Sequence, residues 1–358
     1  MNEDVYPRLA GVLDALPNGF PATKSGIELL ILRKIFTPEE ADLFCDLRLT
    51  AETPEEIAAR TGRPLEGLRE RLLSMWRKGE VSGFVRGDTA KFKMIPWIVG
   101  IYEYQLKRMD REFAKMCERY FTAWGRAFLQ HGPQMMQVIP VQRVIPVRQE
   151  ALTYQQVSDL IDRAQSFMVN ECICKKQQGL LDHPCSKPKE VCLAMAPAPG
   201  MLDNHPWGGR VITREEAREV LRISEESGLV HMTGNVEEGQ NFICNCCGCC
   251  CGMLRVAKKY PSAVNSYYFA RIDPDKCTAC GLCATERCPV GAIRDEGDFF
   301  SVIRARCIGC GLCATACPAQ AVELVRKEEK EMVYPPKNEE AWLEERARQR
   351  GKDFSAFK

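Results

Sequence analysis

The stretch C-T-A-C-G-L-C-A-T-E-R-C-P at residues 277–289 is followed by C-I-G-C-G-L-C-A-T-A-C-P at residues 307–318. In each run, two residues separate the first three cysteines, and a fourth cysteine stands directly before a proline. This spacing lets one loop place three thiolates around a compact core, while the fourth comes from elsewhere. It predicts two 4Fe–4S clusters, and therefore a chain that handles single electrons. Four cysteines also suit zinc, but the interleaved spacing favours cubane clusters.

Residues 268–326 resemble the bacterial-type two-cluster ferredoxins, because eight cysteines and two prolines fall in register. In that family the fourth cysteine of each run binds the cluster of the other run. The resemblance implies a first cluster held by Cys277, Cys280, Cys283 and Cys317. It implies a second cluster held by Cys307, Cys310, Cys313 and Cys288. Four residues lie between Cys283 and Cys288, one more than in the second run, and we expect a bulge to absorb the extra residue.

The length of 358 residues exceeds one ordinary core and predicts two or three domains. A hydrophobic content of 45% and a charged content of 27% are typical of a globular protein, and a net charge of +1 gives no overall attraction to nucleic acid or anionic membranes. The acidic start predicts no secretory signal, and no stretch is apolar enough to span a bilayer. Twenty cysteines then indicate metal binding in a reducing cytoplasm with little oxygen.

Residues 25–97 show the pattern of a winged helix-turn-helix domain, after an N-terminal tail at residues 1–24. Capping boxes at Thr37 and Thr53 begin two helices, a longer helix is expected over residues 64–78, and Gly87-Asp88 predicts a hairpin turn. In a DNA-binding domain of this kind, the longer helix enters the major groove. A docking domain with solvated charges is the favoured alternative, since a fold does not supply a function. The side chains available to DNA are Arg69, Arg71, Arg77 and Lys78.

Residues 98–132 predict one long connecting helix, because apolar and aromatic residues recur at steps of three and four. Such a seam packs across a domain junction or against a second copy of the chain. Cys117 in this helix and Cys45 in the preceding domain are expected to be buried, small hydrophobic residues. Residues 327–358 form a charged C-terminal tail with a short helix from Glu339 to Gln349, and we expect this tail to be solvated.

Residues 133–265 form a cysteine-rich segment whose densest part, N-F-I-C-N-C-C-G-C-C-C-G, occupies residues 241–252. Thiols this close together in a reducing compartment bind metal or exchange disulfides. We expect a third iron–sulfur cluster, with a structural zinc site, or a thiol relay or sulfur-handling site, as alternatives. The zinc alternative uses Cys172, Cys174, Cys185 and Cys192. The full set of candidate ligands is Cys172, Cys174, Cys185, Cys192, Cys244, Cys246, Cys247, Cys249, Cys250 and Cys251.

Three further features surround these cysteines. A capping box at residues 153–156 predicts the start of a helix that leads into them. Cys246-Cys247-Gly248 resembles the Cys-Cys-Gly element of heterodisulfide-reductase-like subunits, which hold a non-cubane cluster, although the likeness covers three residues. We expect the loop histidines to be solvated and leave them outside the site; they are His183, His205 and His231.

The arrangement predicts an α+β fold in three parts: a winged helix-turn-helix, a cysteine-rich α/β domain and a two-cluster ferredoxin domain at residues 266–326. It resembles 4Fe–4S binding proteins of anaerobes, which implies a redox role without a substrate. No dinucleotide-binding or P-loop fingerprint is present. The leading hypothesis is an electron-transfer subunit or module of an anaerobic oxidoreductase system, with another redox protein as partner. The alternatives are an oxidoreductase with its reaction centre in the cysteine-rich domain and a redox-sensing transcription factor.

Overall fold

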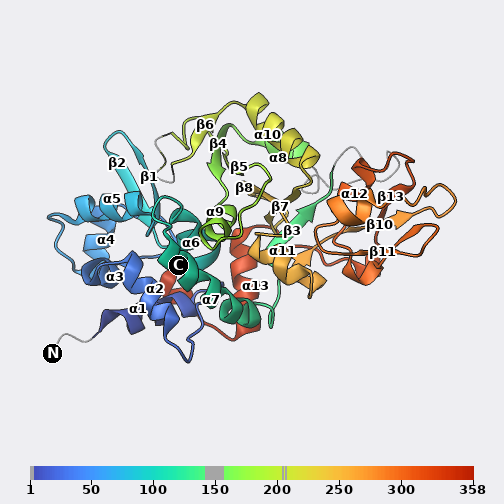
Figure 1. Cartoon of the computed structure of the whole chain (residues 1–358). Coiled ribbons are helices and arrows are strands. Elements are labelled where there is room, and N and C mark those ends of the chain that lie inside the picture. Colours follow the sequence, from blue (N-terminus) through green and yellow to red (C-terminus); the bar gives the residue numbers. More distant parts are fainter. Residues whose placement is uncertain (1–3, 142–156, 204, 206–207) are drawn as a thin grey trace.

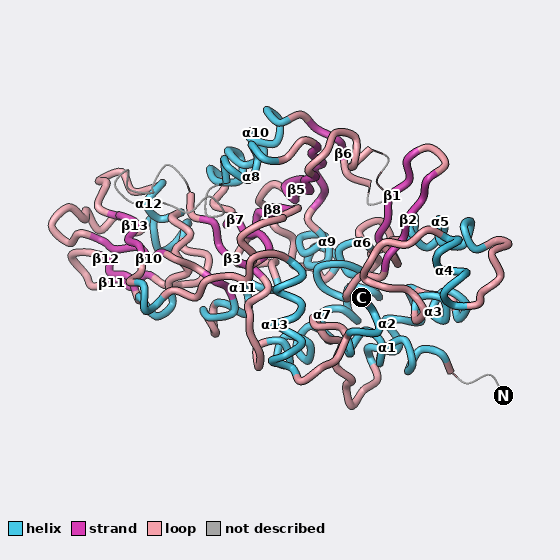
Figure 2. Tube along the Cα trace, turned by 180° about the vertical axis from the view of Figure 1, so that it is seen from behind, coloured by secondary structure: helices cyan, strands magenta, loops and turns pink. Residues whose placement is uncertain are grey.

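The computed structural model describes residues 4–141, 157–203, 205 and 208–358, and it shows a mixed α+β protein. Along the chain, a helical N-terminal part is followed by a central sheet and by a small C-terminal region with short strands (Figure 1). The helix near the C-terminus returns to the N-terminal part, as both views show (Figures 1 and 2). Within the described ranges, no helix is long and apolar enough to cross a membrane. The capping box expected at residues 153–156 lies outside the described residues.

The N-terminal part consists of helices followed by a hairpin. Its elements are α1 (Val5–Ala15), α2 (Ile27–Ile35), α3 (Pro38–Phe44), α4 (Pro54–Thr61), α5 (Leu68–Lys78), β1 (Ser82–Arg86) and β2 (Thr89–Lys93). Both expected capping boxes are confirmed, because Thr37 and Thr53 each accept the backbone N–H three residues later. The expected start of the longer helix at residue 64 is wrong. Gly67 takes the left-handed conformation with φ of 70°, so the helix begins at Leu68 and Leu65 is 49% exposed.

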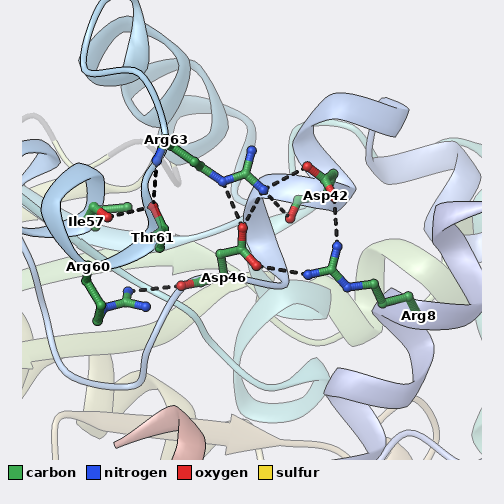
Figure 3. A network of polar contacts seen from close by, with 7 residues as sticks. All are labelled: Arg8, Asp42, Asp46, Ile57, Arg60, Thr61 and Arg63. Atoms are coloured by element: carbon green, nitrogen blue, oxygen red, sulfur yellow. Dashed lines mark hydrogen bonds and ion pairs between the residues drawn. The ribbon is translucent and has the colours of Figure 1, made fainter.

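Residues 1–24 are not only a tail, because α1 packs against the rest of the N-terminal part. Leu9 and Leu13, one helical turn apart, are 0% and 1% exposed. Ion pairs on the outer face of α1 connect it to the neighbouring segments (Figure 3). Arg8 contacts the carboxylates of Asp42 and Asp46 at 2.8 and 2.9 Å, and Arg63 contacts the same two carboxylates at 2.7 and 2.5 Å (Figure 3). The amphipathic pattern of this short segment explains the difference from the expected tail.

The single long helix expected over residues 98–132 is also wrong. The segment instead forms an irregular turn at Trp97–Ile101, a short helix α6 (Tyr102–Tyr104) and the longer helix α7 (Arg111–Phe128). Asp110 begins α7, because its side chain accepts the N–H of Phe113 at 2.8 Å. The apolar periodicity correctly predicted α7. The same periodicity also extends over the residues before Asp110, where the polar N-cap interrupts the helix. Cys117 on α7 and Cys45 after α3 are buried, as expected.

A seven-stranded sheet forms the central part, in the order β6-β4-β5-β8-β7-β3-β9. Its neighbouring strands are antiparallel except for β3 and β9. The strands are β3 (Met136–Ile139), β4 (Ser166–Glu171), β5 (Glu190–Ala196), β6 (Arg210–Ile212), β7 (Val230–Gly234), β8 (Phe242–Cys246) and β9 (Val264–Asn265). The helices of this part are α8 (Val157–Arg163), α9 (Ile173–Leu180), α10 (Arg214–Glu226) and α11 (Gly252–Ala257). Buried residues of α8 and α10 pack on one face of the sheet, against Leu193 and Ile243.

The C-terminal region is built from two small antiparallel pairs. Strand β10 (Tyr268–Ile272) pairs with β13 (Val322–Arg326), and β11 (Ile293–Asp295) pairs with β12 (Phe300–Val302). A short helix, α12 (Leu312–Thr315), lies between β12 and β13 in sequence. Because β10 and β13 come from the two ends of this region, their pairing closes it and holds the two cysteine runs face to face.

The expected helix in the C-terminal tail is confirmed as α13 (Glu339–Arg350), but the solvated tail is wrong. Arg346 is 0% exposed, donates to the Phe128 carbonyl at 2.6 Å and lies 3.7 Å from the centroid of the Phe128 ring. Arg350 donates to the Leu16 carbonyl at 2.6 Å and pairs with Asp14 at 3.0 Å. Two arginines of a charged sequence therefore join α13 to α1 and α7, because they find carbonyl and carboxylate acceptors there.

Candidate metal centres

One set of four thiols surrounds a cavity in the C-terminal region. Its members are Cys277, Cys280, Cys283 and Cys317. The first three lie in the loop after β10, whereas Cys317 follows α12 and comes from the other run. The Cys317 Sγ accepts the backbone N–H of Ala321 at 3.3 Å. The structure thus brings together the first ligand set that the sequence predicts.

A second set of four thiols surrounds a neighbouring cavity. Its members are Cys288, Cys307, Cys310 and Cys313. Backbone N–H groups point at the sulfurs here as well: Ala292 donates to Cys288 at 3.1 Å, and Ala270 donates to Cys307 at 3.3 Å. Such donors stabilise thiolates and tune the reduction potential of a cluster. These four residues form the second predicted ligand set, in which Cys288 crosses over from the first run.

The extra residue in the first run is absorbed by a wider helical turn. The N–H of Cys288 donates to the Cys283 carbonyl, five residues back, at 3.0 Å. In the second run the N–H of Cys317 donates to the Ala314 carbonyl, three residues back, at 3.5 Å. A turn with this five-residue hydrogen bond contains one more residue than an α-turn, so both fourth cysteines still reach their cavities.

The thiols of these two sets lie in surroundings that disfavour free thiolates. Burial raises the pKa of Cys283 and of Cys310 above the ordinary thiol value. Burial also raises the pKa of Cys307, and N–H donation from Ala270 and Gly309 offsets part of that effect. Metal binding requires the thiolate. The positive charge of a metal is therefore what would balance several buried thiolates at each cavity.

In the central part, four thiols form a tight group that we call the four-thiol cluster. Its members are Cys185, Cys247, Cys249 and Cys250, whose sulfurs all lie within 4.8 Å of one another. The Sγ atoms of Cys185 and Cys247 are 3.7 Å apart, and the Cys249 Sγ is 3.6 Å from those of Cys185 and Cys250. Zinc–sulfur bonds of about 2.3 Å in a tetrahedron place sulfurs about 3.8 Å apart. The spacing of the cluster therefore suits one tetrahedral metal ion.

The remaining six cysteines of the central part line one cavity, and we call this group the six-thiol ring. In the order in which each thiol shifts the pKa of the next, they are Cys172, Cys174, Cys251, Cys246, Cys244 and Cys192. The strands explain how the ring is assembled. Leu193 on β5 pairs with Ile243 on β8, which places Cys192 beside Cys244. Because side chains alternate along a strand, both cysteines face away from the sheet surface that α8 and α10 cover.

Two helix N-termini complete the ring. Cys172 is the N-cap of α9 and Cys251 is the N-cap of α11. Hydrogen bonds from ring neighbours, supported by the N–H of Lys175, hold the pKa of Cys172 well below its ordinary value. The pKa of Cys251 is likewise lowered, first by Cys174 and Cys246 and also by the N–H of Leu254. The same hydrogen bonds raise the pKa values of Cys174, Cys192 and Cys246, so lowered and raised thiols alternate around the ring.

The expected zinc set of Cys172, Cys174, Cys185 and Cys192 does not form one tight group of four sulfurs among the described residues. Cys185 belongs to the four-thiol cluster, whereas the other three belong to the six-thiol ring. The Cys-Cys-Gly element is divided in the same way, since Cys246 lies in the ring and Cys247 in the cluster. The alternating directions of successive residues at the end of β8 separate neighbours in sequence into two sites.

A cavity of about 370 Å³ lies beside the six-thiol ring, and all six ring cysteines line it. Its opposite wall comes from α6, α7 and α11, including Phe121, Gly125 and Val256. Polar groups also line it: Gly100 donates its N–H to Glu103 at 2.7 Å, and Tyr102 donates its hydroxyl to Gln177 at 2.7 Å. Glu118 and Arg255 form an ion pair at 2.5 Å in the same lining. Burial raises the pKa of Glu103 to about 8.

Sequence reasoning missed Tyr102 and Glu103, because they lay inside the stretch expected to be one uninterrupted helix. Their polarity within an apolar seam was the signal that could have identified them. Of the histidines, His231 is buried rather than solvated, and its Nδ1 lies 2.5 Å from the Asn245 side-chain oxygen. His205 packs edge-on against Trp76, and His183 is exposed. Among the described residues, the four-thiol cluster contains no histidine.

Comparison with known proteins bears on the C-terminal region. Residues 269–318 match a family model described as a 4Fe-4S dicluster domain. This segment contains the eight cysteines of the two cavities, so the chain contains a 4Fe–4S domain of the ferredoxin type. No curated protein matches the chain.

Proposed function

We propose that the chain is an iron–sulfur electron-transfer protein with two 4Fe–4S clusters in its ferredoxin-type domain. The observation that carries this proposal is the crossed gathering of thiols, three from one run and one from the other, around each of two cavities. Such clusters take up and release single electrons. The chain contributes the thiolates, the backbone donors to Cys288, Cys307 and Cys317, and the burial of both sites.

The contact between the ferredoxin-type domain and the four-thiol cluster supports a path between them. Gly248 of the cluster loop approaches the Pro289 carbonyl so closely that a side chain at residue 248 would collide with it. Beside this contact, Arg287 donates to the carbonyl of Glu226 at 2.7 Å, at the C-terminal end of α10. We infer that the second ligand set, which includes Cys288, is the one that exchanges electrons with the cysteine-rich domain.

The N-terminal part is proposed as a winged-helix-like docking domain for another redox protein, within an anaerobic oxidoreductase system of the cytoplasm. On α5, the Lys78 ammonium pairs with Glu40 at 2.5 Å, and Arg69 donates to the Asp88 carbonyl at 3.3 Å. These side chains are engaged within the domain, which leaves Arg71 and Arg77 exposed on the same helix. This arrangement favours protein docking over DNA binding, which needs a positively charged face.

Metal analysis of anaerobically purified full-length protein tests the proposal. Two clusters require about eight irons and about eight sulfides per chain, and reduction with dithionite should give EPR signals from two interacting centres. A preparation that holds zinc in place of iron at the ferredoxin-type domain would overturn it. Gel shift of duplex DNA at low salt, lost at high salt, would instead favour the transcription-factor alternative.

A further inference from the structure

The six-thiol ring has too many sulfurs for one metal ion of the kind that suits the four-thiol cluster. A tetrahedral ion takes four thiolates. The ring offers six around one cavity, with Cys172, Cys246 and Cys251 only 5–6% exposed. Buried thiols in this number either remain unpaired at a large cost or share several metal ions. The ring therefore points to a polynuclear centre.

The ring and the four-thiol cluster lie against each other, and two peptide bonds, Cys246–Cys247 and Cys250–Cys251, connect them. Cys246 ends β8 inside the ring, and Cys247 begins the cluster loop. Cys251 returns from that loop to the ring as the N-cap of α11. A metal ion in the cluster would hold the loop that positions both Cys246 and Cys251. The fold thus assigns the four-thiol cluster a structural role, which is to fix the loop beside the ring.

The cavity gives the ring an open side: all six ring cysteines line it, whereas Cys250 is the one member of the four-thiol cluster in its lining. Structural zinc sites are closed by their four ligands, whereas sites that bind a further molecule keep an open position. At about 370 Å³, the cavity has the size of small-molecule sites, and its lining comes from both the N-terminal helices and the central sheet, a junction where such sites commonly occur. Its wall opposite the ring is largely apolar, with Phe121, Gly125, Met253 and Val256.

We propose that the six-thiol ring binds a polynuclear iron–sulfur centre, and that the cavity admits a small, largely apolar molecule to it. Iron and sulfide fit six clustered thiolates because sulfide can bridge several irons, each of which keeps a terminal cysteine. The inference goes beyond electron transfer in the ferredoxin-type domain. It also stands on different residues, so the two proposals can fail separately.

Metal content of two paired variants tests the first half. Wild-type protein should contain clearly more than about eight irons per chain. Cys192→Ser with Cys244→Ser, in the ring, should reduce iron to about eight while leaving the ferredoxin-type EPR signals unchanged. The matched control, Cys185→Ser with Cys249→Ser in the four-thiol cluster, should remove about one metal ion and leave the excess iron in place.

Several results would overturn this half. A wild-type iron content of about eight, with two or more zinc ions per chain, would make the ring a zinc site. Excess iron that is lost equally in both variant pairs would mean one shared centre rather than two sites. Retained ferredoxin-type EPR signals show that a variant is folded. The wild-type iron count distinguishes an iron centre from a zinc site without any substitution.

Access through the cavity is tested with tert-butyl isocyanide, a small apolar molecule that binds iron through carbon. It should change the Mössbauer or EPR spectrum of the additional centre in reduced wild-type protein. Gly125→Phe should abolish the change, because a side chain at this position of α7 enters the cavity. Gly125→Ala is the control, since the nearest atom to its Cβ would be the Val256 Cγ2 at 4.0 Å. No spectral change in wild type, or an equal change in the Phe variant, would contradict access through this cavity.

Discussion

A Cβ atom on Gly248 would lie 2.2 Å from the carbonyl oxygen of Pro289. Gly248 stands between Cys247 and Cys249 of the four-thiol cluster, and Pro289 follows Cys288 of the ferredoxin-type domain. The two cysteine-rich segments therefore meet backbone to backbone, with no side chain between them. This contact is the basis for the electron path proposed above, and it makes Gly248 a sensitive position.

Gly248→Ala should slow reduction of the central centre through the ferredoxin-type domain. The methyl group must push the Pro289 carbonyl away, and such overpacking costs about 1–3 kcal/mol in stability. Stopped-flow absorbance after mixing with dithionite would measure the slower phase, with iron content unchanged. Gly179→Ala on α9 is the matched control, because its Cβ would meet nothing within 4 Å. Equal rates in both variants would remove this contact from the proposed path.

Substituting the crossing cysteines should remove one cluster each, and not the cluster of their own run. Cys317→Ser should perturb the centre held by Cys277, Cys280 and Cys283, whereas Cys288→Ser should perturb the centre held by Cys307, Cys310 and Cys313. Each variant should lose up to about four irons. Mössbauer spectra of the double variants Cys317→Ser/Cys277→Ser and Cys317→Ser/Cys307→Ser decide the pairing. Crossed ligation predicts that only the second double variant damages both clusters.

Glu80 should make the protein less stable as the pH rises. Its carboxyl is 0% exposed, and burial, with a smaller contribution from Glu40, raises its pKa from 4.5 to about 8. Between these values the folded protein retains a proton that the unfolded chain has released. The free energy of unfolding therefore falls with pH in this window, by at most about 1.4 kcal/mol per pH unit.

Glu80→Gln removes the titrating group and should flatten that slope. Thermal unfolding of anaerobic, metal-loaded protein at pH 6, 7 and 8 measures it. The control is Glu66→Gln, at an exposed position in the same N-terminal part of the protein, and it should keep the wild-type slope. If the Glu80→Gln variant and the wild-type protein lose stability in parallel as the pH rises, Glu80 is not the group responsible.

Arg346→Leu should destabilise the protein although it lies in a charged C-terminal sequence. The guanidinium is buried, donates to the carbonyls of Phe128 and His131 and stacks on the Phe128 ring. Its loss leaves buried carbonyls without this donor, at about 1–3 kcal/mol. Arg348→Leu, which removes an exposed pair with Glu345, should change the melting temperature little. If both variants change the melting temperature equally little, the buried contacts of Arg346 do not stabilise the protein and the C-terminal tail behaves as a solvated segment.

The local features that short-range chemistry controls were predictable. Capping boxes at Thr37 and Thr53, the Gly87-Asp88 turn and the helix in the tail depend on neighbours along the chain, and all appear in the structure. The break before α7 was missed because an apolar period of three and four continued through it. An N-cap at Asp110 outweighed that period, because it satisfies a helix N–H that would otherwise lack a partner.

The sequence by itself determined that this chain contains a 4Fe–4S domain of the ferredoxin type, because cluster binding requires a fixed spacing of cysteines. It also determined that the ten central cysteines are too many for packing. Only the tertiary structure decided how they divide into the four-thiol cluster and the six-thiol ring. That division depends on strand register and on the face of the sheet to which each side chain points. The spacing of the cysteines along the chain determines neither property.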